Sequence, residues 1–322
     1  MKWKKELEKI IYSKKRSNTE KLLSSIKNKN IPKLYRYFSF SSKNPCIYNN
    51  QCTKIHNCLK EKKRVFDYSY LSLKHNMIGL SSPLDFNDPF DSQFKLSGEF
   101  AEKILKNGLE NEIYPIEITD KQMKTIKESS DIYKTSQELF GVDLKKKLEK
   151  SMLDLLDYEM YPILNTIRIA CFSEVNDSIL MWSHYANNHT GFCVEYDFNK
   201  LNNIKLLDNL YPVFYKEFLF DVSDVFFKSY KGTEADELDI YASVLTKNKE
   251  WNYEREWRYL SYGGDFILNV PRPESVYLGS RVSDENKNSI INLFNETNIP
   301  LFQMKPDNSE FKLNYFPINK KI

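Results

Sequence analysis

The sequence predicts an α+β protein with a central mixed or antiparallel sheet, flanking helices, a helical N-terminal arm and a helical insertion. The chain has 322 residues, 41% hydrophobic and 14% aromatic, which is enough to bury a sizeable core. The chain contains segments in which apolar and polar residues alternate, as in strands, and segments in which apolar residues recur at helical spacing. It has no internal repeat. We expect a helical arm over residues 1–30 and a single α+β domain over 31–322, with a helical insertion at 99–160.

The composition argues against several classes of protein, including those that bind phosphates through glycine-rich loops and those that span a membrane. The net charge of +3 is too small by itself to indicate nucleic-acid binding. Only nine glycines are present, and neither a G-x-G-x-x-G run nor a phosphate-binding loop motif occurs. No apolar run approaches the roughly 20 residues of a membrane span, and the charged start lacks a signal-peptide pattern. We expect a cytoplasmic protein without membrane contact, whose five cysteines are reduced thiols.

The first 100 residues combine a helix with short strands. Trp3 and Leu7 fall at helical spacing, and residues 32–38 form a proline-led strand in which Arg36 lies between two tyrosines. Residues 77–83 form a second short strand. The turn that follows holds Asn87 and Asp88 next to a proline, between two phenylalanines expected to be buried. It is either an Asx turn or a place to hold a cation or a sugar hydroxyl.

A group of possible metal ligands stands apart from these elements. Cys46, Cys52, His56 and Cys58 occupy thirteen residues, but they lack the paired spacing of a zinc site. Free cysteines in a variable loop are the simpler interpretation.

The central unit, residues 167–198, predicts a strand, a turn, a helix and another strand. Ile167, Ile169 and Cys171 alternate with their neighbours, as in a buried strand. Ser178 supplies N-cap chemistry for a helix over 179–188, and residues 192–196 start the next strand.

The remainder of the chain continues the α+β pattern. We expect strands at 207–216 and a helix at 236–249. A strand over 251–260 would place Glu254, Glu256 and Arg258 on one face and an aromatic row on the other. As a helix, the same segment would be a solvated charge ladder. The tail reads as strands at 266–270, 275–278, 301–304 and 311–316, with a helix at 284–296.

Four motifs identify a family. LYRY (34–37), LSSPLDFNDPFD (80–91), CFSEVNDSILMWSHYANNHTGFCVEYDF (171–198) and EWNYEREWRYL (250–260) resemble a bacterial family known as domain of unknown function 2971. The resemblance covers residues 33–282. The name of that family carries no activity.

The order of these motifs also resembles, more weakly, the ADP-ribosyltransferase fold. Transferases of that fold carry a His or Arg on a first strand, an aromatic-Ser strand, a helical Tyr that stacks on nicotinamide, and a late strand that opens on a catalytic Glu. Arg36, Ser173, Tyr185 and Glu256 take those places here, with Glu254 two residues before the last. This chain departs from the pattern by lacking a first-strand His and by its insertion at 99–160.

The resemblance implies NAD as a substrate. Glu256 would stabilise the cationic sugar as nicotinamide leaves, and Glu254 would activate the acceptor, which is a protein or a nucleic acid. The remaining members of the candidate NAD-binding set are Arg36, Tyr37, Ser173, Tyr185, His184, Asn87 and Asp88. This site includes no metal ion. The implied protein is an NAD-consuming bacterial toxin or phage-defence effector.

Two alternatives remain open from the sequence. One is a non-catalytic module that binds a ligand or a partner through aromatic faces around Trp182, Trp251 and Trp257. The other is a metal-dependent hydrolase or nuclease that uses Asp88, Asp91, His184 and one of the two glutamates. The sequence carries no signal of oligomeric state.

Overall fold

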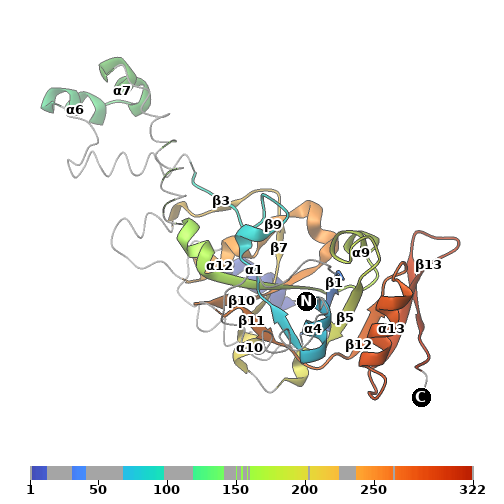
Figure 1. Ribbon diagram of the computed structural model, residues 1–322. Helices are drawn as coiled ribbons and strands as arrows, with labels where there is room; N and C mark the ends of the chain where they lie inside the picture. The colour runs from blue at the N-terminus through green and yellow to red at the C-terminus, as the bar shows by residue number, and fades with distance from the viewer. Residues whose placement is uncertain are drawn as a thin grey trace.

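The computed structural model describes residues 2–12, 31–40, 68–97, 119–140, 150, 154, 158, 160–201, 204–224, 237–263 and 265–320 (Figure 1). Its helices are α1 (Lys2–Ile11), α4 (Tyr68–His75), α6 (Asp120–Lys127), α7 (Ile132–Phe140), α9 (Ile179–Tyr185), α10 (Ile204–Asp208), α12 (Glu237–Val244) and α13 (Asp284–Leu293). Three 3-10 helices, η1 (Pro83–Asp85), η2 (Phe198–Lys200) and η3 (Lys249–Glu254), join them.

The main sheet has eight strands in the order β14-β13-β12-β5-β1-β4-β10-β6. Their bounds are β1 (Leu34–Phe38), β4 (Ile167–Ser173), β5 (Phe192–Tyr196), β6 (Leu210–Pro212), β10 (Glu256–Tyr262), β12 (Ser275–Leu278), β13 (Leu301–Pro306) and β14 (Leu313–Pro317). Neighbours are antiparallel except β12 and β13, which are parallel. The predicted α+β class with a mixed sheet is confirmed.

Three two-stranded ladders flank this sheet. β2 (Met77–Gly79) pairs with β11 (Ile267–Asn269), and β3 (Phe94–Lys95) pairs with β8 (Phe220–Asp221). β7 (Phe214–Lys216) pairs in parallel with β9 (Thr246–Asn248). The last ladder brings β9 close to the start of β10, because the Glu256 N–H donates to the Tyr215 hydroxyl at 2.7 Å.

Helices cover both faces of the main sheet. Strand alternation places Leu34 and Phe172 on one face, in a core that also takes Leu73 of α4, Leu206 of α10 and Ile290 of α13. The opposite face carries two smaller cores. One contains residues of α1, α12, β4 and β10, and the other contains residues of α9, β1, β5 and β12. Asp91, Lys247, Glu254, Glu256 and Arg258, described below, lie on this second face, whereas the Arg36 guanidinium contacts Phe38 and Phe172 of the first core.

The sheet is incompletely paired at its centre. β1 and β4 share a single residue pair, Tyr35 with Ser173, whereas β4 and β10 pair from Ser173 to Ile167. Farther along β4, Ser81 replaces β1 and exchanges two backbone hydrogen bonds with Ile169, at 2.8 and 2.9 Å. Between these points, Arg36 Nη1 donates to the Cys171 carbonyl at 2.8 Å. We call this break between β1 and β4 the seam.

The N-terminal helix is held by buried leucine and isoleucine side chains. Leu7 and Ile11 of α1 are fully buried in the core on the second face. Lys4 pairs with Glu174, and Trp3 packs edge-on against Trp257 with ring centroids 5.8 Å apart. Residues 13–30 of the predicted arm lie outside the described residues.

Two helices lie within the predicted insertion. Thr119 caps α6 with a capping box to Gln122, and α6 packs on α7 apart from the sheet (Figure 1). The rest of residues 99–160 is described only at 119, 128–131, 150, 154, 158 and 160. Among the residues that the structure describes, no helix combines the length and the apolarity needed to cross a membrane.

Most of the predicted elements are present, but the strand expected at 251–260 is wrong over its first half. Residues 249–254 form η3, and the strand begins only at Glu256. Asn248 caps η3 through a bond from the Glu250 N–H, and Arg255 ends it in a left-handed conformation with φ 44°. The helix expected over 236–249 also ends early, at Val244, and β9 follows it.

Candidate functional site

Five buried charged side chains meet on the second face of the sheet. They are Asp91, Lys247, Glu254, Glu256 and Arg258, and each is at most 5% exposed. The turn after η1 contributes the aspartate, β9 the lysine, the end of η3 one glutamate, and β10 the last two. Buried charges are stable only when they are paired and hydrogen-bonded, so this arrangement demands close geometry. We call these five residues the charge cluster.

Arg258 is the centre of the cluster and has no exposed side-chain surface. Its Nη1 and Nη2 atoms donate to the two carboxylate oxygens of Asp91 at 2.8 and 2.6 Å. Its Nε donates to Glu256 Oε1 at 2.8 Å, and Nη1 also donates to the Val244 carbonyl at 2.7 Å. The planar guanidinium thus binds one carboxylate with two parallel bonds and orients the second.

Lys247 links the remaining carboxylates. Its Nζ lies 2.6 Å from Glu254 Oε2, 3.1 Å from Glu256 Oε2 and 3.4 Å from Asp91 Oδ2. The same ammonium lies 4.9 Å from the centroid of the Trp251 ring. The Tyr185 hydroxyl of α9 donates to the other oxygen of Glu254 at 2.6 Å. Glu254 is therefore held between a cation and a phenol.

The pKa values of the two glutamates, Glu254 and Glu256, are shifted in opposite directions. Burial raises the pKa of Glu256, but the charges of Arg258 and Lys247 outweigh burial and lower it to about 2. Burial, together with the charge of Glu256, raises the pKa of Glu254 above its ordinary value. Burial lowers the pKa of Lys247, but the three carboxylates overcome that effect and raise it. Glu256 is thus held as the anion, whereas the raised pKa of Glu254 favours its protonated form relative to a free carboxyl.

A cavity of about 200 Å³ opens beside the cluster. It brings together seven of the predicted site residues: Arg36, Tyr37, Asn87, Ser173, Tyr185, Glu254 and Glu256. Segments from both sides of the seam line it, including β1, β4, α9 and the turn that carries Asp91. Its lining includes the three carboxylates and two cations of the cluster, together with the cation of Arg36. We call it the seam cavity.

Arg36 is the other cation of the cavity wall, and its guanidinium lies in the seam. One nitrogen donates to Cys171, as described above, and the guanidinium carbon lies 5.5 Å from the ring centroid of Phe38 and 5.9 Å from that of Phe172. Its Nε is buried without a hydrogen-bond partner. Arg36 makes no ion pair within the described part of the chain, so its charge remains available to an anion at the cavity.

The side chains of two predicted site residues, Ser173 and Tyr37, form hydrogen bonds within the protein. Ser173 is fully buried, and its hydroxyl donates to the Glu254 carbonyl at 2.6 Å and accepts from the Val175 N–H. The Tyr37 hydroxyl donates to the Val175 carbonyl at 2.9 Å. Both side chains fix the loop after β4 and, through Ser173, the end of η3. They position the cavity wall.

Two other predicted residues lie outside the lining of the seam cavity. His184 is exposed, and its ring contacts Trp251 with centroids 6.1 Å apart. Asp88 is buried in its turn, where Oδ1 accepts from the Phe90 N–H at 2.9 Å. This is the predicted Asx turn. The expectation of two buried phenylalanines there is wrong for Phe90, which is 62% exposed.

The metal ligands predicted as alternatives are not grouped. Within the described residues, no set of three or more His, Cys, Asp or Glu side chains is arranged to hold a metal ion. Asp91, Glu254 and Glu256 bind Lys247 and Arg258 instead. Cys46, Cys52, His56 and Cys58 lie outside the described residues.

The sequence interpretation missed Lys247 altogether and considered Asp91 only as a metal ligand. Lys247 was expected on an amphipathic helix, where a lysine is normally solvated. The sequence feature that could have indicated a buried Lys247 is its position between the apolar pair Val244–Leu245 and the aromatic Trp251. Together these neighbours predict an apolar setting for the Lys247 ammonium. The pairing of Asp91 with Arg258, far apart in sequence, had no local signal.

The fold and the cluster define an α+β protein with a small charged cavity at a break in its sheet. Residues 181–259 match the model of a family described as "Protein of unknown function (DUF2971)", which supports the resemblance seen in the motifs. The matched segment contains Tyr185, Lys247, Glu254, Glu256 and Arg258. No curated protein and no solved structure matches the chain significantly.

Proposed function

We propose that the chain is an NAD-consuming enzyme of the ADP-ribosyltransferase type, acting as a bacterial toxin or phage-defence effector. The observation that carries the proposal is the seam cavity, where Arg36, Tyr185, Glu254 and Glu256 line one space despite their separation in sequence. Its lining contains three carboxylates and three cations, with Glu254 and Glu256 next to each other at Lys247. The two neighbouring glutamates suit the cationic sugar that forms as nicotinamide leaves.

The cavity volume sets how NAD would bind. Sites for drug-sized ligands measure roughly 300–1,000 Å³, so a cavity of about 200 Å³ takes one end of a dinucleotide. The nicotinamide end fits beside the two glutamates and the aromatic wall of Tyr185. The pyrophosphate would then lie at the cavity rim, where the Arg36 guanidinium can meet an anion.

The chemistry is a transfer of the ribose carbon from nitrogen to an acceptor. The bond between the ribose and nicotinamide breaks, its electron pair leaves with neutral nicotinamide, and positive charge develops on the sugar. Glu256, held ionised by Arg258 and Lys247, stabilises that charge. Glu254, whose pKa is raised, accepts the proton that the acceptor hydroxyl, amine or water loses when its lone pair forms the new bond.

The test measures NAD binding by calorimetry and nicotinamide release by chromatography. Glu254→Gln should slow release by at least about 100-fold, as expected for loss of a general base. Tyr185→Phe keeps the ring and removes the bond to Glu254, so it should shift the pH dependence of release. Glu250→Gln, an exposed change on the same 3-10 helix, serves as the control and should leave release unchanged.

Two results would contradict the proposal. Folded wild-type protein that neither binds NAD nor releases nicotinamide would set it aside, as would full activity in Glu254→Gln. Saturable binding of NAD without turnover would instead favour the binding-module alternative. That alternative draws support from Glu256, both of whose oxygens already accept bonds from Lys247 and Arg258.

A further inference from the structure

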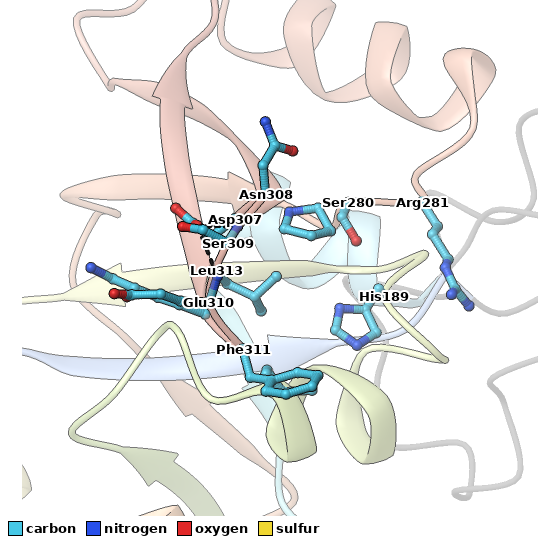
Figure 2. A pocket seen from close by; sticks show the side chains of 12 residues that line it. His189, Ser280, Arg281, Asp307, Asn308, Ser309, Glu310, Phe311 and Leu313 are labelled. Atoms are coloured by element: carbon cyan, nitrogen blue, oxygen red, sulfur yellow. Dashed lines mark hydrogen bonds between the residues drawn. The ribbon is translucent and has the colours of Figure 1, made fainter.

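A second and larger cavity, of about 510 Å³, lies away from the charge cluster. It is formed by the loop between β13 and β14, the start of α9, and the neighbouring segments at His189 and Ser280–Arg281 (Figure 2). Its volume falls within the roughly 300–1,000 Å³ of small-molecule sites. None of its lining residues belongs to the seam cavity, so the inference below does not depend on the proposed function.

One wall of this cavity is apolar and exposed. Ile179 is 40% exposed, and Phe311 has its whole side chain open to solvent. Pro306 and Leu313 continue the wall toward the sheet. Ile179 and Phe311 together give the cavity mouth an exposed apolar surface, which a bound apolar group would remove from water.

Hydrogen bonds to Asp307 cross-link the loop that carries Phe311. Asp307 Oδ1 accepts from the Ser309 N–H and hydroxyl, both at 2.8 Å, and from the Glu310 N–H at 3.1 Å. Its Oδ2 accepts from Asn314 Nδ2 at 2.7 Å. Four donors thus compensate the negative charge of Asp307. Figure 2 shows Glu310 directed away from His189, on the far side of the loop.

His189 forms another wall and is held in a strained backbone. Three consecutive non-glycine residues, Asn187, Asn188 and His189, have φ values of 47°, 55° and 67°. Such strain persists only where surrounding contacts impose it, and it concentrates at functional sites. Here the His189 N–H donates to Trp182, and its carbonyl accepts from the Arg281 N–H at 2.9 Å.

The hydrogen bonds of Ser183 favour one tautomer of the His189 ring. The Ser183 hydroxyl donates to the Ile179 carbonyl at 2.9 Å, so its oxygen is left to accept from His189 Nε2 at 3.2 Å. Nδ1 is then a bare acceptor, and it is buried without a partner. An unpaired buried acceptor is costly, and a ligand N–H or O–H that reaches it removes this cost.

The cavity lining also contains two exposed cations, Arg281 and Lys312. Arg281 is exposed, and its guanidinium makes no ion pair or hydrogen bond with any residue that the structure describes. We propose that this cavity binds a small aromatic anion, whose acidic group pairs with Arg281, whose ring packs against Ile179 and Phe311, and whose N–H or O–H group serves His189. Aromatic carboxylates, sulfonates and phosphates share this chemistry.

The test uses 8-anilinonaphthalene-1-sulfonate, a fluorescent aromatic anion with an N–H group, titrated into the full chain. We expect saturable binding at one site. Arg281→Gln and Phe311→Ser should each weaken it about fivefold or more, because they remove the anion partner and the apolar wall. Both side chains are exposed, so these variants should fold, which circular dichroism verifies.

Matched controls separate this site from general surface binding. Arg272→Gln and Phe218→Ser remove an exposed arginine and a 74% exposed phenylalanine elsewhere, and both should bind as wild type does. Titration with 1-naphthoate, which has a ring and an acid group but no N–H donor, should give weaker binding and lose the same affinity in Arg281→Gln. Absence of saturable binding would overturn the proposal, as would equal losses in the test and control variants.

Discussion

Replacing Arg258 by Met tests whether the charge cluster holds the second face of the sheet together. Methionine keeps much of the side-chain length and removes the guanidinium. The cluster then contains three carboxylates and one cation, so its net charge changes from minus one to minus two. Asp91 loses two direct bonds, at 2.6 and 2.8 Å, and Glu256 loses its bond to Nε.

The cost follows from burial. Removing one partner of a buried ion pair destabilises proteins by about 3–5 kcal/mol, because a buried charge is left uncompensated. For a chain of this size about 1 kcal/mol lowers Tm by roughly 2 °C, so Arg258→Met should lower Tm by about 6–10 °C. Adding Asp91→Asn should restore part of the loss, because it removes one uncompensated carboxylate.

Thermal unfolding followed by circular dichroism measures these differences. The control is Lys249→Met, which breaks an exposed pair between Lys249 and Glu217 at 2.5 Å and should lower Tm far less, because solvent screens exposed charges. If Arg258→Met lowers Tm no more than this control does, the cluster does not stabilise the fold in the way described. If Asp91→Asn worsens the loss, uncompensated charge is not its cause.

Three further predictions concern separate parts of the molecule. Because burial and the Glu256 charge raise the pKa of Glu254, the folded chain keeps this proton to higher pH than the unfolded chain does, and stability falls as pH rises from 4.5 through the raised pKa. Glu254→Gln removes this dependence, so its Tm relative to wild type should rise across that window in a pH series, and a flat difference contradicts the pKa direction. Leu7→Ala should cost about 2–5 kcal/mol in urea unfolding, since Leu7 is fully buried in the core under α1, and a loss below about 1 kcal/mol would mean that α1 is not anchored there. Gly191→Ala should destabilise the chain in thermal unfolding because its new Cβ would lie 2.0 Å from the Phe38 carbonyl oxygen, and an unchanged Tm would mean that β1 moves freely at that point.

Local sequence pattern was sufficient where packing and hydrogen bonding are local. The alternation of Ile167 and Ile169 predicted β4, and the N-cap at Ser178 predicted the start of α9, where its hydroxyl accepts from the Met181 N–H. The alternation of Glu256 and Arg258 correctly predicted that these two side chains share a face of β10, whereas Glu254 reaches the same cavity from the end of η3. These signals depend on residues within one or two turns of each other.

The cluster itself needed contacts that sequence spacing does not contain. Lys247 reaches the glutamates because β9 pairs in parallel with β7, at Tyr215 opposite Lys247, and such pairing joins distant segments. The left-handed conformation of Arg255 turns the chain between Glu254 and Glu256. A non-glycine residue rarely adopts this conformation, so local propensity favoured a continuous strand instead.

Because of the seam, few backbone hydrogen bonds resist separation of the two halves of the sheet. The seam divides the strands into two groups, which we call leaves. One leaf contains β14, β13, β12, β5 and β1, and the other contains β4, β10 and β6. One residue pair of the sheet joins the two leaves directly. Separating them by a small distance at the cavity stretches the bond from Arg36 to Cys171, whereas a fully paired sheet would lose a row of backbone bonds. In amide hydrogen exchange the leaves should therefore open as two cooperative units, with the boundary between β1 and β4.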